Sequence, residues 1–297
     1  MKLKLSCPDF TFPLLPHDDV LTLIAMMGFQ GVDIGLFEDR SHIYPSHVVD
    51  NLAASARDLS SRVQDKGLEI ADVYFQASGP GLPALAINHP DAEERRQARD
   101  LFPRVVEFTL RCNASHITIE PGLPWEGESY ETSLKRACEE LAWRVELAEA
   151  AGCVCAVEPN VESLTRTPEQ THRMLEMTPG LTLTLDYSHF AYREISDDES
   201  ETLIPHTSHF HARGGHKNRL QSLIQHNVID YPRVVRALRD SGYEGYVCVE
   251  YVWVDWEGCN EVDTLSETIQ MRDLLLSVDL DGSAGLRGDC YGALDVL

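Results

Sequence analysis

The sequence is poor in positive charge and contains no long uncharged apolar run. Lysine and arginine number 25 against 48 aspartates and glutamates, which gives a formal net charge of -23 at pH 7. A surface of this sign repels phosphate backbones and anionic membranes, so a nucleic-acid or membrane partner is disfavoured. The first residues, MKLKLSCPDFTF, lack an apolar stretch of secretory length, and no uncharged run long enough to span a bilayer occurs. We therefore expect a cytoplasmic protein.

Further absences narrow the class of protein. The eight cysteines include no C-x-x-C pair, so neither a zinc ribbon nor a disulfide framework is indicated, and most should be buried reduced thiols. No G-x-G-x-x-G opens a predicted helix, and the first predicted strand is followed by PDFTFPLLP in place of a glycine-rich phosphate loop. An open, doubly wound sheet that binds a dinucleotide is therefore disfavoured.

Strand and helix patterns alternate along the chain. Its 297 residues, 43% apolar and 25% charged, can build one large core. Between short apolar runs lie segments with helical spacing, such as the face formed by Leu134, Leu141 and Val145. The predicted strands are residues 3–7, 31–37, 68–75, 115–120, 153–158, 181–186, 208–213 and 246–252. Eight strands joined by helices must pair in parallel, and they most simply close into a (β/α)8 TIM barrel.

The barrel is expected to span residues 1–276 as a single domain, with residues 277–297 as a C-terminal extension. The segment LDGSAGLRGDCYGALDVL has the composition of an added tail, which either stays loose or covers a partner subunit. We expect a homo-oligomer, dimer or tetramer, with a hetero-oligomer as the alternative. Pro103 is expected to interrupt the helix predicted at 91–112.

Polar side chains stand at the carboxyl ends of the last four predicted strands, and these ends converge on one cavity in such a barrel. The four residues are Glu158, Asp186, His211 and Glu250. Three carboxylates and one imidazole suit manganese, magnesium, cobalt or zinc, and the cation would offset the repulsion among the carboxylates. Any one of these residues alone can be a cap or a turn residue. Independent caps need not fall at the ends of four consecutive strands, so we predict a metal site.

With these residues the chain resembles the xylose isomerase-like barrel superfamily, which contains sugar isomerases, ketose 3-epimerases, inosose dehydratases and relatives of endonuclease IV. The resemblance covers roughly residues 1–276. It rests on VEPN with Glu158, LDYSH with Asp186 and His189, HFHAR with His211, NVIDYPRVVRALRDSGYEGYVCVE with Glu250, and a last helix with SETIQMRDLL. The order of these elements and the approach to Glu250 are specific, whereas each tetrapeptide alone is weak.

The resemblance implies one divalent metal ion, Mn²⁺ first and Mg²⁺, Co²⁺ or Zn²⁺ otherwise, and a small-molecule sugar substrate. In the ketose epimerases, the residues that match Glu158 and Glu250 bind the metal and also form the catalytic acid/base pair. The residue that matches His189 reaches a substrate hydroxyl or carbonyl. Deprotonation beside a carbonyl gives an enediolate. The implied activity is a metal-dependent isomerase or epimerase that acts on a ketose or keto-sugar.

The likeness to the ketose epimerases weakens among the substrate-binding residues. Those enzymes carry a substrate-binding arginine six residues after the metal histidine, where this chain has Lys217. His189, Arg213 and Lys217 are the candidate donors to the enediolate oxygen. Glu120, at the end of the fourth predicted strand, is a candidate for binding a substrate hydroxyl. Sugar specificity is therefore left open.

Two further groups of residues follow from strand parity and position. His209 shares the inward parity of His211 but lies one layer deeper, so it should orient other groups and not bind the metal. Three tryptophans follow strands on the side of the predicted site, and their rings either stack on a sugar face or serve in packing or a subunit contact. These residues are Trp125, Trp253 and Trp256.

Two alternatives to the isomerase remain open, and one is disfavoured. A lyase or dehydratase that acts on a keto-sugar, an inosose or a 3-keto-glycoside, C-glycosides included, shares the first proton abstraction and then expels a β substituent. A non-catalytic barrel stabilised by metal is the other alternative. An endonuclease IV-like activity would need more metal-binding histidines on strands two and three and a basic surface, and the sequence provides neither.

Overall fold

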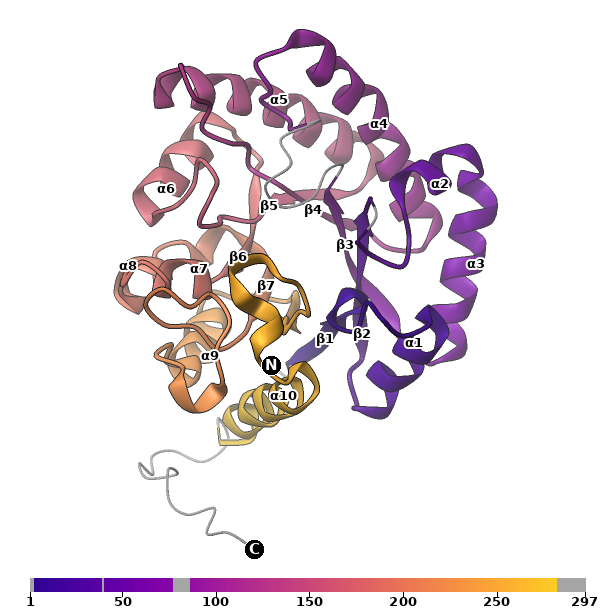
Figure 1. Ribbon diagram of the computed structural model, residues 1–297, viewed down its shortest axis with the longest axis vertical. Helices are drawn as coiled ribbons and strands as arrows, with labels where there is room; N and C mark the ends of the chain where they lie inside the picture. The colour runs from indigo at the N-terminus through magenta and orange to yellow at the C-terminus, as the bar shows by residue number, and fades with distance from the viewer. Residues whose placement is uncertain (1–2, 39, 77–85, 282–297) are drawn as a thin grey trace, which may run out of the picture.

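Eight parallel strands close into one barrel in the computed structural model, which describes residues 3–38, 40–76 and 86–281 (Figure 1). β1 pairs with both β2 and β8, and this pairing closes the sheet. The strands are β1 Lys4–Pro8, β2 Gly31–Phe37, β3 Glu69–Gln76, β4 His116–Ile119, β5 Val154–Val157, β6 Thr182–Asp186, β7 Thr207–Ala212 and β8 Tyr246–Val249. The predicted (β/α)8 TIM barrel is confirmed.

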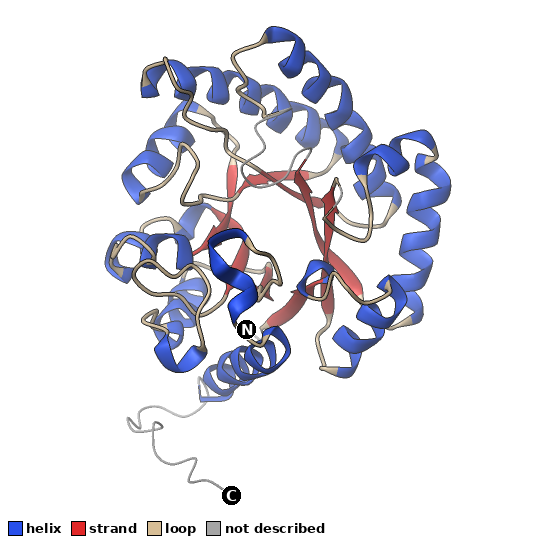
Figure 2. Ribbon diagram, viewed as in Figure 1, coloured by secondary structure: helices blue, strands red, loops and turns tan. Residues whose placement is uncertain are grey.

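Helices surround the barrel on its outside (Figure 2). They are α1 His17–Met26, α2 Pro45–Asp50, α3 Leu52–Asp65, α4 Ala92–Arg111, α5 Tyr130–Ala151, α6 Pro168–Met177, α7 Ser188–Ala191, α8 Asp197–Glu201, α9 Tyr231–Asp240 and α10 Thr264–Asp281. Short 3-10 turns occur at η1 Asp9–Thr11, η2 Ile204–His206, η3 Ile224–His226 and η4 Trp256–Glu261. The predicted apolar face of α5, with Leu134, Leu141 and Val145, is buried against the barrel.

The helix predicted at 91–112 is not interrupted at Pro103. α4 runs continuously from Ala92 to Arg111 with Pro103 inside it. Pro103 is exposed, so water can satisfy the carbonyl that the missing N–H leaves unpaired. The opposite face of the helix, with Phe102 and Val106, is buried and supports the continuous path.

At the end of the chain, α10 extends to Asp281, beyond the boundary predicted at residue 276. The rest of the predicted extension, residues 282–297 with Cys290, lies outside the described residues. The seven described cysteines are all buried free thiols, as predicted. None of the described helices is long and apolar enough to cross a membrane.

The inside of the barrel carries buried polar side chains among its apolar residues. Asp33 on β2 and Asp72 on β3 are fully buried, and so is Thr184 on β6. Each aspartate has a histidine partner from another strand: His209 lies 2.6 Å from Asp33, and His116 lies 2.6 Å from Asp72. The Asp33–His209 contact therefore links β2 to β7 across the barrel, whereas the Asp72–His116 contact links the neighbouring strands β3 and β4.

Candidate active site

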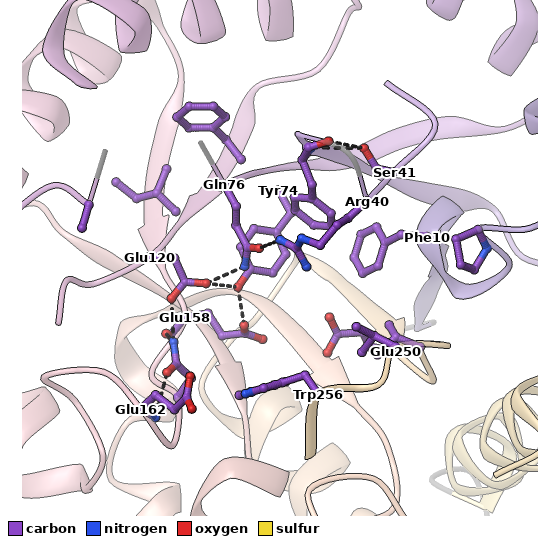
Figure 3. A pocket seen from close by; sticks show the side chains of 18 of the residues that line it. Phe10, Arg40, Ser41, Tyr74, Gln76, Glu120, Glu158, Glu162, Glu250 and Trp256 are labelled. Atoms are coloured by element: carbon purple, nitrogen blue, oxygen red, sulfur yellow. Dashed lines mark hydrogen bonds between the residues drawn. The ribbon is translucent and has the colours of Figure 1, made fainter. Parts of the chain in front are cut away.

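A cavity of about 450 Å³ opens at the carboxyl ends of the strands. Its walls include the aromatic rings of Phe10, Phe37, Trp253 and Trp256, whereas its inner end is polar and contains Glu158 and other ionisable groups (Figure 3). Barrel enzymes place their chemistry at this end of the strands. The cavity has the volume of a small-molecule site.

The four predicted metal ligands come from neighbouring strands; Glu158 and Glu250 line this cavity, whereas Asp186 and His211 are fully buried and are not among its lining residues. Asp186 is the last residue of β6 and pairs in register with His211 on β7. Glu158 and Glu250 directly follow β5 and β8, and their backbone N–H groups continue the ladder by donating to the carbonyls of Ile119 and Ala212. Because the strand geometry continues for one more residue, both glutamates keep the inward orientation of the alternate positions before them.

The four side chains form one buried cluster around Glu158. His211 Nδ1 lies 2.7 Å from Glu158 Oε1 and 3.3 Å from Glu250 Oε2. Potential ligand atoms of Glu158, His211 and Glu250 lie within 4.8 Å of one another, as do those of Glu158, Asp186 and His189. All five residues are buried. Each of these two groups of three is compact enough to surround one ion, and Glu158 belongs to both.

The carboxylates of the cluster outnumber its positive groups, and the pKa values of Glu158 and His211 respond to this excess of negative charge. Burial raises the pKa of Glu158, and the nearby charge of Glu250 raises it further. Burial alone would lower the pKa of His211, but Glu250, Asp33 and Glu158 raise it well above its ordinary value. Without another cation, the fold therefore retains protons among these groups. A divalent ion would replace those protons with fixed positive charge.

Arg213 supplies a second positive charge to the cluster. Its Nη2 lies 2.7 Å from Asp186 Oδ2 and 3.4 Å from Glu250 Oε2, and its Nε donates to Ser188 Oγ at 3.0 Å. Burial raises the pKa of Glu250, but His211 and Arg213 outweigh this effect and lower it. The guanidinium of Arg213 therefore favours the ionised form of Glu250 and forms an ion pair with Asp186.

The donor set fits a divalent cation. Three carboxylates and one imidazole provide the oxygen and nitrogen atoms that manganese, magnesium, cobalt and zinc accept. Glu250 Oε2 is buried and has no hydrogen-bond partner among the described residues. An unsatisfied buried carboxylate oxygen next to other potential ligands is the feature expected of a metal site.

His189 is a buried ring with a hydrogen-bond donor near each of its two nitrogens. Burial and the charge of Arg213 lower its pKa well below the ordinary value. The backbone N–H of Val161 lies 3.3 Å from Nδ1, and Arg213 Nη2, which can only donate, lies 3.2 Å from Nε2. A neutral ring carries its proton on one nitrogen, so it accepts only one of these two hydrogen bonds. Contacts at both nitrogens therefore hold the ring beside the ligand cluster.

Glu120 lies in a separate polar group on the cavity wall (Figure 3). It accepts hydrogen bonds from Gln76 Nε2 at 2.5 Å, Asn160 Nδ2 at 2.7 Å and the Tyr74 hydroxyl at 3.1 Å. Burial and the charge of Glu158 raise the pKa of Glu120 to about 7. Tyr74 also lies 2.6 Å from Glu158 Oε2, so its hydroxyl links this group to the ligand cluster.

The remaining predicted residues are placed differently. Lys217 is exposed, pairs with Glu194 at 2.6 Å and does not line the cavity. Trp253 and Trp256 line the cavity, and the Trp256 ring lies 6.2 Å from that of His189. Trp125 is not among the lining residues and donates to Asn88 Oδ1 at 3.2 Å instead.

Sequence reasoning missed several residues of the site. Tyr74 and Gln76 alternate along β3 and therefore share the inward parity, which is a signal that the sequence contains. Asn160 follows Glu158 by two residues and has the same kind of signal. Arg40, whose Nη2 donates to Gln76 Oε1 at 2.5 Å, comes from the β2–α2 connection, and no periodicity points to it.

A match to one family over most of the chain decides which family it belongs to. Residues 21–273 match the family described as xylose isomerase-like TIM barrel. The chain belongs to this family. The sequence motifs predict this family, with carboxylates at the carboxyl ends of β5, β6 and β8. No curated protein matches the chain closely enough to add a more specific assignment.

Solved structures share this fold at low sequence identity. A D-psicose 3-epimerase with D-tagatose from Clostridium cellulolyticum H10 is 17% identical, with a TM-score of 0.73 over 93% of this chain and 99% of that chain. The 3-keto-D-glucoside 4-epimerase from E. coli is also 17% identical, with a TM-score of 0.69 over 93% and 100%. A probable 3-DHS dehydratase from Bacillus anthracis is 15% identical, with a TM-score of 0.64 over 96% and 100%. These similarities show the fold.

Proposed function

We propose that the chain is a divalent-metal-dependent isomerase or epimerase that acts on a ketose or keto-sugar through an enediolate. The observation that carries the proposal is the position of Glu158 and Glu250. Both carboxylates face His211 in one buried cluster, and both line the same cavity of small-molecule size. Structural neighbours that are named as ketose 3-epimerases and a 3-keto-glucoside 4-epimerase support the same class of reaction.

Glu158, Asp186, His211 and Glu250 would hold the ion, with Mn²⁺ as the first choice. When bound, a divalent ion polarises a substrate carbonyl and so acidifies the neighbouring C–H. One glutamate removes that proton and the other returns a proton to the opposite face of the enediolate. This exchange inverts a carbon, or it moves the carbonyl if the proton returns to the adjacent carbon.

Several side chains are assigned to substrate binding. His189 and Arg213 both line the cavity and contact each other at 3.2 Å; His189 hydrogen-bonds a substrate oxygen beside the reacting carbon, and Arg213 adds positive charge to the same end of the cavity. Glu120 accepts from a hydroxyl further along the sugar, held in place by Gln76 and Asn160. The rings of Trp253 and Trp256 cover an apolar face of the substrate. Lys217 has no contact with the cavity that would support a role in binding.

A lyase or dehydratase is the second candidate, and the outer part of the cavity favours it. Phe10 and Phe37 line the cavity together with Trp253 and Trp256, and these four rings provide an apolar surface on which an aglycone can pack. A 3-keto-glycoside would place its leaving group on this surface. Proton abstraction by Glu158 or Glu250 would then be followed by expulsion of the β substituent. A structural neighbour named as a probable dehydratase supports this alternative.

One experiment distinguishes the two reactions. The protein loaded with Mn²⁺ is incubated in deuterium oxide with ketoses, inososes and 3-keto-glycosides, and the products are followed by mass spectrometry and NMR. A substrate that gains deuterium and is converted into an isomer of otherwise equal mass supports the isomerase or epimerase. Loss of water or of an aglycone favours the lyase. No exchange with any substrate, from protein shown to contain metal, rejects both.

A further inference from the structure

A buried carboxylate lies directly beneath the histidine of the candidate metal site. Asp33 comes from β2, and its side chain is fully buried inside the barrel. Its Oδ2 lies 2.6 Å from His209 Nε2 and 3.6 Å from His211 Nε2. The other nitrogen of His211, Nδ1, faces Glu158 and Glu250. The His211 ring therefore connects the site on one side to Asp33 on the other.

We propose that Asp33, held in place by His209, is a positioning residue for His211. The 3.6 Å between Asp33 Oδ2 and His211 Nε2 is longer than a hydrogen bond, and Nε2 has no hydrogen-bond partner among the described residues. The negative charge of Asp33 at this distance favours the ring form that carries its proton on Nε2, which leaves the Nδ1 lone pair free for the ion and increases its basicity. This inference rests on the proposed metal site and adds two residues, Asp33 and His209, that do not line the cavity themselves.

Both histidines that face Asp33 belong to β7, with His209 Nε2 at 2.6 Å and His211 Nε2 at 3.6 Å from Oδ2. His209 is itself buried, with its ring at 5.3 Å from the ring of His116. Because both partners of Asp33 come from β7, the carboxylate on β2 fixes that strand across the barrel from the opposite wall.

A second metal site is the competing reading of the same residues. Potential ligand atoms of Asp33, His209, His211 and Cys248 also lie within 4.8 Å of one another. Two ligand atoms bound tetrahedrally to one zinc ion at about 2.1 Å are roughly 3.4 Å apart. Asp33 and His209 are separated by only 2.6 Å, which is the distance of a direct hydrogen bond. The distance favours a hydrogen-bonded pair over two ligands.

The barrel provides a matched control for this pair. Asp72 on β3 is also fully buried, and its Oδ1 lies 2.6 Å from His116 Nδ1. The other nitrogen of His116 contacts Ser208 Oγ at 2.8 Å and does not reach the ligand cluster. Asp33→Asn and Asp72→Asn thus make the same chemical change at the same depth, but only the first removes a contact with His211.

The experiment titrates Mn²⁺ alone into full-length wild type, Asp33→Asn and Asp72→Asn by isothermal titration calorimetry. Asp33→Asn should bind Mn²⁺ about 10- to 100-fold more weakly than wild type, whereas Asp72→Asn should keep the wild-type affinity. The visible absorption of the Co²⁺-loaded proteins should change for Asp33→Asn only. His209→Gln, which loosens Asp33 without removing it, should give an intermediate loss and serves if Asp33→Asn does not fold.

Each other outcome overturns the inference. Equal losses in Asp33→Asn and Asp72→Asn would mean a general effect of a buried polar pair on the fold. Wild-type affinity in folded Asp33→Asn, or in His209→Gln if that is the variant that folds, would mean that the carboxylate does not act through His211. Two ions per wild-type chain, one of them lost in Asp33→Asn, would make Asp33 a ligand. A wild type that binds no ion would remove the proposed function as well, whereas tight binding without sugar turnover would leave the positioning role intact.

Discussion

Replacing Glu158 with glutamine separates the two roles proposed for this residue. The change preserves the size of the side chain and one oxygen that can face an ion, but it removes the charge and the ability to accept a proton. Loss of a general base typically slows proton transfer by about 10²- to 10⁴-fold. We therefore expect Glu158→Gln to lose nearly all turnover while it keeps part of its affinity for Mn²⁺.

The contacts of Glu158 set the size of the loss in metal affinity. Its two oxygens face two different partners, the Tyr74 hydroxyl at 2.6 Å and His211 Nδ1 at 2.7 Å. An amide has one oxygen, so only one of these contacts can keep an acceptor. A lost hydrogen bond to a charged group is worth about 1.5–3 kcal/mol. If that amount is lost from ion binding, the dissociation constant rises about 10- to 100-fold.

The assay compares solvent deuterium exchange with calorimetric Mn²⁺ binding in the same preparations. Glu250→Gln is the matched partner, because a single remaining base can exchange the proton of one epimer without inverting it. Glu128→Gln is the control, since Glu128 pairs with Arg136 outside the cavity. Exchange and conversion at the wild-type rate in Glu158→Gln would refute the assignment of Glu158 as a base.

Two further predictions concern stability without metal. Arg213→Gln removes the cation that lies 2.7 Å from the buried Asp186 and 3.4 Å from the buried Glu250. Thermal unfolding in EDTA should therefore show a Tm that is lower than that of wild type by about 10 °C and that partly recovers with excess Mn²⁺. An unchanged Tm would contradict the ion pair. Burial and Glu158 raise the pKa of Glu120 from 4.5 to about 7. Protonated Glu120 therefore contributes stability that is fully present below pH 4.5 and is lost as the pH rises to about 7. In Glu120→Gln, the Tm should depend less on pH across this range than in wild type. A Tm profile parallel to that of wild type would contradict the raised pKa.

The sequence predicted the barrel because its physical signals are repeated. Eight strands, each followed by a helix, leave few ways to bury all the apolar faces, and closure of β1 onto β8 follows from that number. The prediction failed at Pro103 because the effect of a proline depends on which face of the helix it occupies. That face is known only when the helix packs against its neighbours.

The candidate site was predictable where strand parity places a residue and unpredictable elsewhere. Glu158, Asp186, His211 and Glu250 lie at strand ends, and the structure brings them together. Arg213 continues the parity of β7 and reaches the cluster, whereas Lys217 lies beyond the strand and turns to the surface. The contacts of Arg40 depend on the path of a loop, which local sequence patterns do not determine.

The charges of the cluster lead to a prediction about protons. Glu158, Asp186 and Glu250 would carry three negative charges, and Arg213 together with a divalent ion would neutralise them. Without the ion, the raised pKa values of His211 and Glu158 mean that protons fill part of that role. Binding of the ion should therefore release protons.

The number of protons released can be measured by titrating Mn²⁺ calorimetrically in buffers of different ionisation enthalpy at one pH. The apparent enthalpy should change with the buffer in the direction of proton release. The release should diminish as the pH rises, because groups with raised pKa values lose their protons before the ion arrives. His211→Asn removes one of the two groups and should reduce the release at the lower pH. An enthalpy that does not depend on the buffer would mean that the cluster is already deprotonated, and the electrostatic account of the site would then be wrong.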